Sequence, residues 1–268
     1  MNKIINKKTI MGILAVLLFS ISMTFISNPN VKTTSGNSLS NEKIGWGIKR
    51  NDNHEQPDVG KKNKQLLDAA DGICLGNNEK KYVYLTFDNG YEAGYTSKIL
   101  EVLKQNNVTA TFFITAHYLN TQPELVKQMI DEGHIVGNHT VNHKSMPSLT
   151  EEQIKKEVMD LHQAVYEKFN YEMKYIRPPM GEYSEKTLAV TNSLGYKTVM
   201  WSFAYEDWDE KNQPNEEKSK EKILNNLHNG EIILLHATSK TNTNILDSVL
   251  KEIKAKGYEI RSINDFEK

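Results

Sequence analysis

Several residues that could do chemistry follow short apolar segments of the sequence. Asp88 comes directly after one such segment, and Arg177 follows another and precedes two prolines. A carboxylate in this position could take a proton from a water molecule, and a nearby guanidinium would orient it and lower its pKa. The alternatives are ordinary turn chemistry of an Asp-Asn-Gly sequence for Asp88 and a structural ion pair for Arg177.

His139 and His143 are four residues apart. On a helical turn this spacing would place both imidazoles on one face, as in zinc sites that contain two histidines. Because histidine pairs at this spacing also occur in ordinary surface loops, a loop without chemistry is the alternative interpretation.

His236 ends the most apolar segment of the chain, and Asp207 and Trp208 follow another. His236 could be a general acid that protonates a leaving amine, or a core histidine with satisfied hydrogen bonds. Asp207 could bind either Arg177 or the His236 ring, and Trp208 could form a wall of a substrate pocket.

These residues share one position relative to the secondary structure that the sequence predicts. From residue 80 onward, short apolar segments alternate with amphipathic helical ones, which is typical of strand–helix units. The seven strands are expected at residues 82–87, 111–115, 134–137, 174–177, 197–202, 231–235 and 258–261. Seven repeats favour an α/β fold with a parallel barrel, whose C-terminal face carries the active site.

The composition limits the classes of protein. The chain of 268 residues is 38 % hydrophobic and 25 % charged, as globular proteins are. Its 33 basic and 34 acidic side chains give a net charge of −1, without the basic excess typical of nucleic-acid binding. Since Cys74 is the single cysteine, no internal disulfide can form, and a metal would need His, Asp or Glu ligands.

The first 27 residues predict export. Three lysines precede an apolar segment that is short for a membrane span, which is the pattern of a signal peptide. A cleaved signal is expected, and an uncleaved membrane anchor is the alternative, so the protein should lie outside the cytoplasmic membrane. Residues 28–79 are predicted to be a linker and a polar extension of open role, and residues 80–268 the catalytic domain.

The five polar segments resemble, in order, the five motifs of the polysaccharide deacetylase family, carbohydrate esterases of the nodulation-protein-B homology type. The resemblance covers about residues 80–268 and implies a distorted (β/α)7 barrel that hydrolyses N-acetyl groups. It implies a catalytic base, Asp88, positioned by Arg177, and a catalytic acid, His236, with Asp207 tuning both.

The same resemblance implies the ligands and the pocket. His139 and His143 would bind a divalent metal, with zinc expected, while Leu234 and Trp208 would line the pocket. A backbone N–H near Tyr183 would hold the oxyanion.

One position departs from the family pattern. The family's first motif reads T-F-D-D-G, and Asn89 replaces the second aspartate, which binds the metal. A neutral amide donates less to a divalent cation than a carboxylate does, so metal affinity should fall. We expect Asn89 to be a weak metal ligand or to hold a ligand water.

The first motif, Y-L-T-F-D-N-G-Y-E at residues 84–92, and Trp46-Gly47 in the extension look like the peptidoglycan N-acetylmuramic acid deacetylase branch, also called delta-lactam-biosynthetic. This resemblance implies peptidoglycan glycan strands as the partner, and muramic acid freed of its stem peptide as the substrate. Muramic δ-lactam in spore cortex would follow, which places the protein in the cell wall or spore envelope. An N-acetylglucosamine deacetylase and a glycan-binding module without turnover are the alternatives. No nucleic acid or protein partner is expected.

Overall fold

Seven parallel strands form the centre of the computed structural model, which describes residues 39–268. Their order is β7-β5-β4-β3-β2-β8, and β9 pairs with the start of β2. The bounds are β2 Tyr82–Asn89, β3 Thr111–Ile114, β4 Ile135–Asn138, β5 Tyr175–Ile176, β7 Lys197–Thr198, β8 Glu231–His236 and β9 Glu259–Arg261. All seven predicted strands are confirmed, with shorter bounds for β5 and β7.

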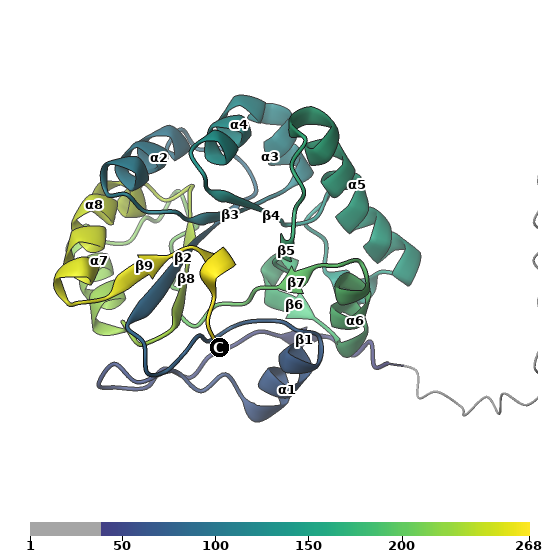
Figure 1. The fold of residues 1–268 in the computed structure, drawn as a ribbon, viewed down its shortest axis with the longest axis horizontal. Coiled ribbons are helices and arrows are strands. Elements are labelled where there is room, and N and C mark those ends of the chain that lie inside the picture. Colours follow the sequence, from purple (N-terminus) through teal and green to yellow (C-terminus); the bar gives the residue numbers. More distant parts are fainter. Residues whose placement is uncertain (1–38) are drawn as a thin grey trace, which may run out of the picture. The chain divides into compact units, whose positions relative to one another are not determined.

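The sheet curls, and the chain beyond β7 connects its two ends (Figure 1). Phe203 forms a parallel bridge with Ile233 of β8. Its N–H donates to the Ile232 carbonyl at 3.2 Å, and its carbonyl accepts from Leu234 at 2.9 Å. The ring of strands is therefore joined at this point by a single short bridge, which agrees with the predicted distorted (β/α)7 barrel.

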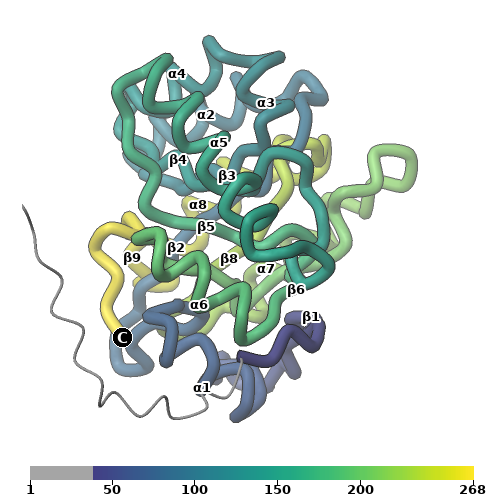
Figure 2. The backbone as a smooth tube through the Cα atoms, turned by 90° about the vertical axis from the view of Figure 1, so that its right-hand side faces the viewer, coloured from purple at the N-terminus to yellow at the C-terminus, as the bar shows by residue number. Residues whose placement is uncertain are grey.

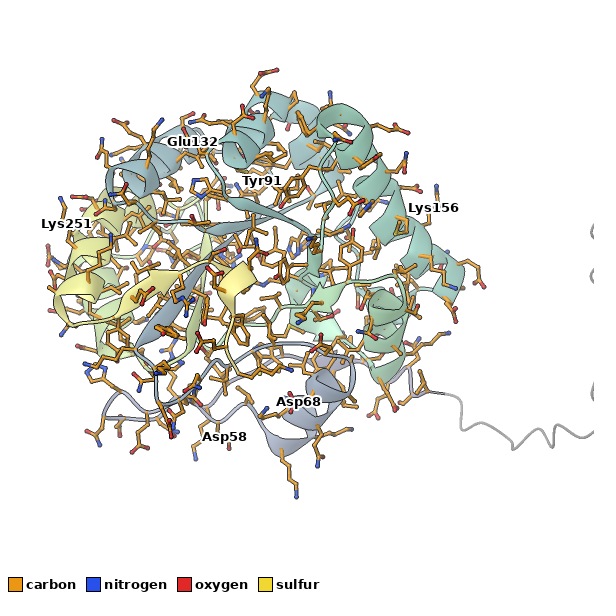
Figure 3. The ribbon with its side chains drawn as sticks, in the orientation of Figure 1. Asp58, Asp68, Tyr91, Glu132, Lys156 and Lys251 are labelled. Carbon is orange, nitrogen blue, oxygen red and sulfur yellow. The ribbon has the colours of Figure 1, made fainter. Side chains whose placement is uncertain are left out.

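Helices cover the outside of the strand ring (Figures 1 and 2). They are α2 Thr96–Gln105, α3 Ala116–Thr121, α4 Pro123–Asp131, α5 Glu151–Phe169, α6 Glu185–Ser193, α7 Glu216–Asn225 and α8 Lys240–Ala255. Their apolar sides pack on the strands, where Phe87 and Phe112 stack with ring centroids 5.1 Å apart. Charged side chains such as Lys156 and Lys251 point outward (Figure 3), as expected of amphipathic helices.

The described part of the extension, residues 39–79, belongs to the same compact unit as the barrel. It contains α1 (Lys61–Ala69) and β1 (Ile44–Gly45), and β1 pairs antiparallel with β6 (Glu182–Tyr183). The sequence did not predict this small sheet. The predicted signal segment lies outside the described residues, and within residues 39–268 we find no helix long and apolar enough to cross a membrane.

Glu231 at the start of β8 gives a prediction about stability. It is fully buried, and neither carboxyl oxygen has a hydrogen-bond partner within residues 39–268. Burial raises the pKa of Glu231 well above its ordinary value, so the folded protein holds the carboxyl protonated. The stabilisation that Glu231 contributes is complete below the pKa of its carboxyl in the unfolded chain. It is lost as the pH rises through the pKa of this carboxyl in the folded protein.

Glu231→Gln keeps the shape and removes the titration. We expect the variant's advantage in free energy of unfolding to grow from pH 5 to pH 9, by about 1.4 kcal/mol per unit of pKa shift. Thermal unfolding at three pH values measures it, with the exposed Glu79→Gln as the control. A difference that does not change with pH would contradict a buried protonated carboxyl.

Candidate active site

A cavity of about 1120 Å³ lies at the C-terminal ends of the strands. Its wall includes six of the residues singled out from the sequence: Asp88, His139, His143, Trp208, Leu234 and His236. Because four separate chain segments supply these residues, the fold brings together what the sequence keeps far apart. This placement is where an α/β barrel carries its site.

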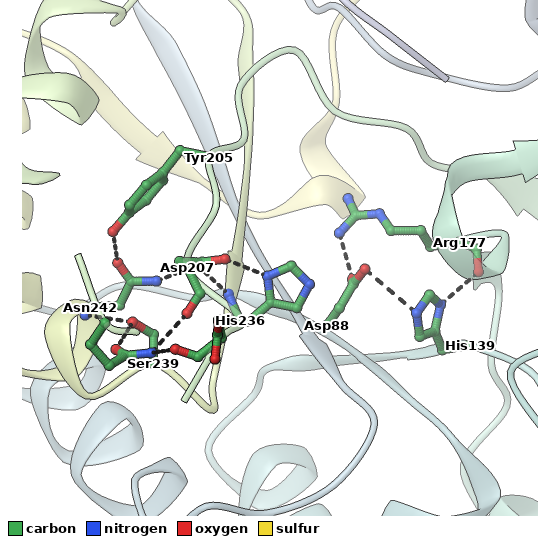
Figure 4. A network of polar contacts seen from close by, with 10 residues as sticks. Asp88, His139, Arg177, Tyr205, Asp207, His236, Ser239 and Asn242 are labelled. Atoms are coloured by element: carbon green, nitrogen blue, oxygen red, sulfur yellow. Dashed lines mark hydrogen bonds and ion pairs between the residues drawn. The ribbon is translucent and has the colours of Figure 1, made fainter. Parts of the chain in front are cut away.

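Asp88 and Arg177 form a buried ion pair behind the cavity wall (Figure 4). Arg177 Nη1 donates to Asp88 Oδ1 at 2.8 Å, and the arginine side chain is fully buried. Burial pushes the pKa of Asp88 upward, but the charge and hydrogen bond of Arg177, together with the charge of His236, outweigh burial, so the pKa lies below its usual value. Asp88 is therefore an ionised carboxylate, as a base at neutral pH must be.

The guanidinium of Arg177 is held by packing as well as by charge. It lies over the Phe113 ring at 4.3 Å from the centroid, and its Nε donates to the Val199 carbonyl at 3.1 Å. Phe113 in turn occupies the space beside Gly137, where a Cβ would meet the ring at 2.5 Å. Only glycine at position 137 lets β4 and β3 approach with Phe113 in this place.

His139 faces Asp88 with a defined tautomer. Its Nδ1 lies 2.8 Å from the Arg177 carbonyl, which only accepts, so Nδ1 carries the hydrogen and Nε2 presents a lone pair. Nε2 is 3.6 Å from Asp88 Oδ2. Burial lowers the pKa of His139 to about 4, so at neutral pH two acceptors face each other.

His143 lies beside His139, with ring centroids 4.8 Å apart. The loop that carries it contains two non-glycine residues in the left-handed region, Thr140 at φ 68° and His143 at φ 52°. Such strain costs roughly 1–3 kcal/mol per residue and needs support. Glu157 of α5 supplies it, since its carboxylate accepts from the backbone and side-chain nitrogens of Asn142, both at 2.7 Å.

His236 is held on the opposite side of the cavity by Asp207. Asp207 is fully buried, and its Oδ1 lies 2.6 Å from His236 Nδ1 while its Oδ2 accepts from the His236 backbone at 2.9 Å. Burial would lower the pKa of His236, but the hydrogen bond and charge of Asp207 raise it above the usual value. Of the two partners expected for Asp207, the structure selects the His236 ring, which suits a proton donor.

Two predicted site residues are not brought to the cavity. Tyr183 does not line the cavity, since its backbone pairs with Ile44, its side chain is fully buried, and its hydroxyl donates to Asn63 at 2.8 Å. Asn89 alternates with Asp88 along β2, so it points toward the helix layer, and its Nδ2 lies 3.5 Å from Thr96 Oγ1. The carbonyl oxygen of Asn89 has no partner within the described residues.

The cavity rim contains the predicted Trp208 and two apolar residues that sequence reasoning passed over, Tyr91 and Met180. Tyr91, Met180 and Trp208 are among the most exposed large apolar side chains of residues 39–268, at 47 %, 56 % and 50 %, and all three line this cavity. His117, which carried no functional signal in the sequence, lines it as well. An exposed apolar rim of this kind marks a binding surface.

Comparison with known proteins agrees with this geometry. The polysaccharide deacetylase family model matches residues 75–199. Peptidoglycan-N-acetylmuramic acid deacetylase PdaA of Bacillus subtilis is 45 % identical over 231 residues, which is 85 % of this chain and 88 % of PdaA. The chain belongs to the polysaccharide deacetylase family. It is accordingly a hydrolase that acts on the amide of N-acetyl groups.

Solved structures of polysaccharide deacetylases share the fold. The structure of PdaA, a family 4 carbohydrate esterase, superposes with a TM-score of 0.83 at 44 % identity, covering 85 % of this chain and 98 % of that one. A family 4 carbohydrate esterase from Bacillus anthracis gives 0.73 at 40 % identity, with the same coverage. A peptidoglycan-N-acetylglucosamine deacetylase of Bacillus cereus is 31 % identical over 70 % of this chain and 89 % of its own.

The donors present fit a divalent cation in part. Two neutral imidazoles and the Asp88 carboxylate are ligands that zinc accepts, and the two facing acceptors of His139 and Asp88 are what a cation would satisfy. Within residues 39–268, however, no three His, Cys, Asp or Glu side chains already stand in a metal-binding arrangement. Asn89 does not complete the set, because its side chain lies on the other side of β2.

The extension holds one wall of the cavity. Trp46 donates from its backbone N–H to Gly181 at 2.8 Å and from Nε1 to the Trp201 carbonyl at 2.9 Å. Gly181 and Trp201 both line the cavity, and a Cβ on Gly181 would meet the Trp201 ring at 2.7 Å and Trp46 at 3.2 Å. The extension therefore fixes this wall rather than merely covering the barrel.

Trp46→Ala is expected to lower the free energy of unfolding by about 3–5 kcal/mol, the usual loss for a buried aromatic side chain. Trp208→Ala is the matched control, since Trp208 is half exposed and should cost far less. Urea unfolding of both variants measures the difference. Equal losses would show that Trp46 does not support the wall.

Proposed function

We propose that this protein removes N-acetyl groups from peptidoglycan glycan strands outside the cytoplasmic membrane. The observation that carries the proposal is one cavity with an ionised carboxylate, Asp88, and a histidine of raised pKa, His236, in its wall. Hydrolysis of an acetamide needs a base for water and an acid for the leaving nitrogen. Pure glycan binding needs neither.

The reaction follows from these two groups. Asp88 takes a proton from a water molecule as its oxygen attacks the acetyl carbonyl carbon. Arg177 keeps Asp88 ionised and fixed in direction. His236 gives a proton to the nitrogen as the C–N bond breaks, which yields acetate and a free amine. We assign the oxyanion contact to a backbone N–H of the stretch around Met180, because Met180 lines the cavity and Tyr183 does not.

We further propose that His139 and His143 hold a divalent cation, most simply zinc. When bound, such an ion polarises the acetyl carbonyl and acidifies water. The neutral state of both imidazoles supports this assignment, since burial lowers both pKa values. Asn89 contributes no charge, so binding should be weaker than at a site with two carboxylates.

For the substrate we propose muramic acid freed of its stem peptide, which would lead to muramic δ-lactam in spore cortex. Support comes from the similarity to PdaA along 85 % of the chain. One observation favours N-acetylglucosamine instead: within the described residues, no lysine or arginine lines the cavity, whereas Asp88 and Glu206 do. A lactyl carboxylate would thus need His139, His143 or His236 as its hydrogen-bond partner.

Acetate release from two peptidoglycans tests these proposals, one intact and one stripped of stem peptides by an amidase. The muramic proposal expects release from stripped strands only, and a chelator should reduce it. Release from both, or from a chitin oligomer, would indicate the N-acetylglucosamine activity. No release from any glycan would leave a binding module and overturn the proposed hydrolysis.

A further inference from the structure

Asn242 stands directly behind the Asp207–His236 pair, although no sequence signal singled it out. It is the third residue of α8 and only 2 % exposed. Its Nδ2 donates to Asp207 Oδ2 at 2.5 Å, and its Oδ1 accepts from the Tyr205 hydroxyl. Figure 4 shows the three side chains and His236 as one continuous chain of hydrogen bonds.

The chemistry of the neighbours fixes the orientation of this amide. Burial raises the pKa of Tyr205, so the hydroxyl keeps its proton and can donate to Oδ1. A carboxylate accepts and does not donate, so Asp207 requires the NH2 side. Both ends of the amide therefore agree on one orientation, and flipping it would break two buried hydrogen bonds at once.

The consequence lies in how the two oxygens of Asp207 are used. Oδ2 is occupied by Asn242 Nδ2 and by the His236 backbone N–H, at 2.5 and 2.9 Å. Oδ1 then remains for His236 Nδ1 at 2.6 Å. With Nδ1 held this way, the other ring nitrogen of His236 is left for the cavity, which His236 lines.

The start of α8 keeps Asn242 in place. Ser239 caps this helix, since its Oγ accepts from the Asn242 backbone at 3.1 Å. Gln213 ties the loop after Asp207 to the same helix end, because it donates to the Asp207 carbonyl at 3.2 Å and accepts from Ser239 Oγ at 2.9 Å. These hydrogen bonds thus tie the loop and the start of the helix together beside the carboxylate.

We propose that Asn242, oriented by Tyr205, is a positioning residue for the reaction, which locks Asp207 so that His236 presents its free ring nitrogen to the substrate. This inference rests on the proposed deacetylation, in which His236 is the proton donor. Asn242 is buried and does not line the cavity, so it acts only through Asp207.

The test compares Asn242→Leu with Asn244→Leu, an exposed asparagine two residues further along α8 that bonds to Glu216. For Asn242→Leu, kcat should fall roughly ten- to hundredfold, the range for a hydrogen bond to a charged group, while KM stays within about twofold. The alkaline limb of kcat should move to lower pH. The titratable and charged groups that face His236 are Asp207, Asp88, Arg177 and His143, and the substitution leaves all four in the chain.

An NMR titration of the His236 ring gives a readout that does not depend on activity. The His236 ring should titrate at lower pH in Asn242→Leu than in the unchanged protein, because an Asp207 that is no longer held in place supports the Nδ1 proton less well. It should titrate at the same pH in Asn244→Leu. Tyr205→Phe, which removes one hydroxyl, should shift it in the same direction and serves if Asn242→Leu does not fold. Unchanged titration in both Asn242→Leu and Tyr205→Phe would overturn the inference, whereas an inactive parent with shifted titration would overturn only the proposed function.

Discussion

Asp88→Asn is expected to lower acetate release by roughly 10²–10⁴-fold, the contribution of a positioned general base. The amide keeps the shape of the carboxylate and can still accept from Arg177, but it cannot take a proton from water. Since Asp88 Oδ1 is held at 2.8 Å by Arg177 and only Oδ2 is left toward His139, no neighbouring oxygen replaces it. Acetate release at saturating substrate measures the loss.

The control for Asp88→Asn is Asp209→Asn, which removes one exposed carboxylate just after Trp208 and outside the cavity lining. It should retain full activity. Circular dichroism must show that Asp88→Asn is folded at the assay temperature, because Arg177 loses its counter-charge. Full activity in a folded Asp88→Asn protein would remove Asp88 from the mechanism.

Arg177→Met should have the second large effect, on stability and on pH dependence. Removing one partner of a buried ion pair leaves the other uncompensated and costs about 3–5 kcal/mol. Asp88 would then keep the burial that raises its pKa and lose the charge that lowers it. The acid limb of kcat/KM should therefore move to higher pH, since the base must be ionised.

The sign of the stability effect can be checked by pH. In the unchanged protein the pKa of Asp88 is lowered, so its stabilisation is full above the unfolded value of about 3.9 and is lost on acidification. The difference in free energy of unfolding between Arg177→Met and the unchanged protein should thus become smaller at acid pH. Lys197→Met, which breaks an exposed pair with Asp71, should cost under about 1 kcal/mol. Equal losses of unfolding free energy in Arg177→Met and Lys197→Met would contradict a buried Asp88–Arg177 ion pair.

The sequence was informative where a pattern is local. Alternation of apolar strands and amphipathic helices predicted all seven strands, and the position of polar residues after those strands predicted the cavity. Their position directly after predicted strands was enough to single out Asp88, His139, His143 and His236. Their roles came from a resemblance, because residue types and spacing alone left a turn, a loop and a core histidine as alternatives.

The sequence did not place three residues, two because of contacts between distant segments and one because of the alternation along a strand. A backbone N–H near Tyr183 was expected to hold the oxyanion, but the Tyr183 backbone pairs with Ile44, far earlier in the chain. Asn242 has no local signal, since its partners Asp207 and Tyr205 belong to another loop. Asn89 was judged by its chemistry, whereas the alternation of β2 decides which way it points.

The hydrogen bonds of Trp46 bear on how this enzyme can be dissected and recombined. The stretch shared with the family model begins at residue 75, yet the carbonyls of Gly181 and Trp201 find their donors at residue 46. A gene fragment cut at the family boundary would leave both carbonyls unpaired beside the cavity. The smallest transplantable unit therefore includes Trp46, and chimeras between relatives should exchange the segment around it together with the barrel.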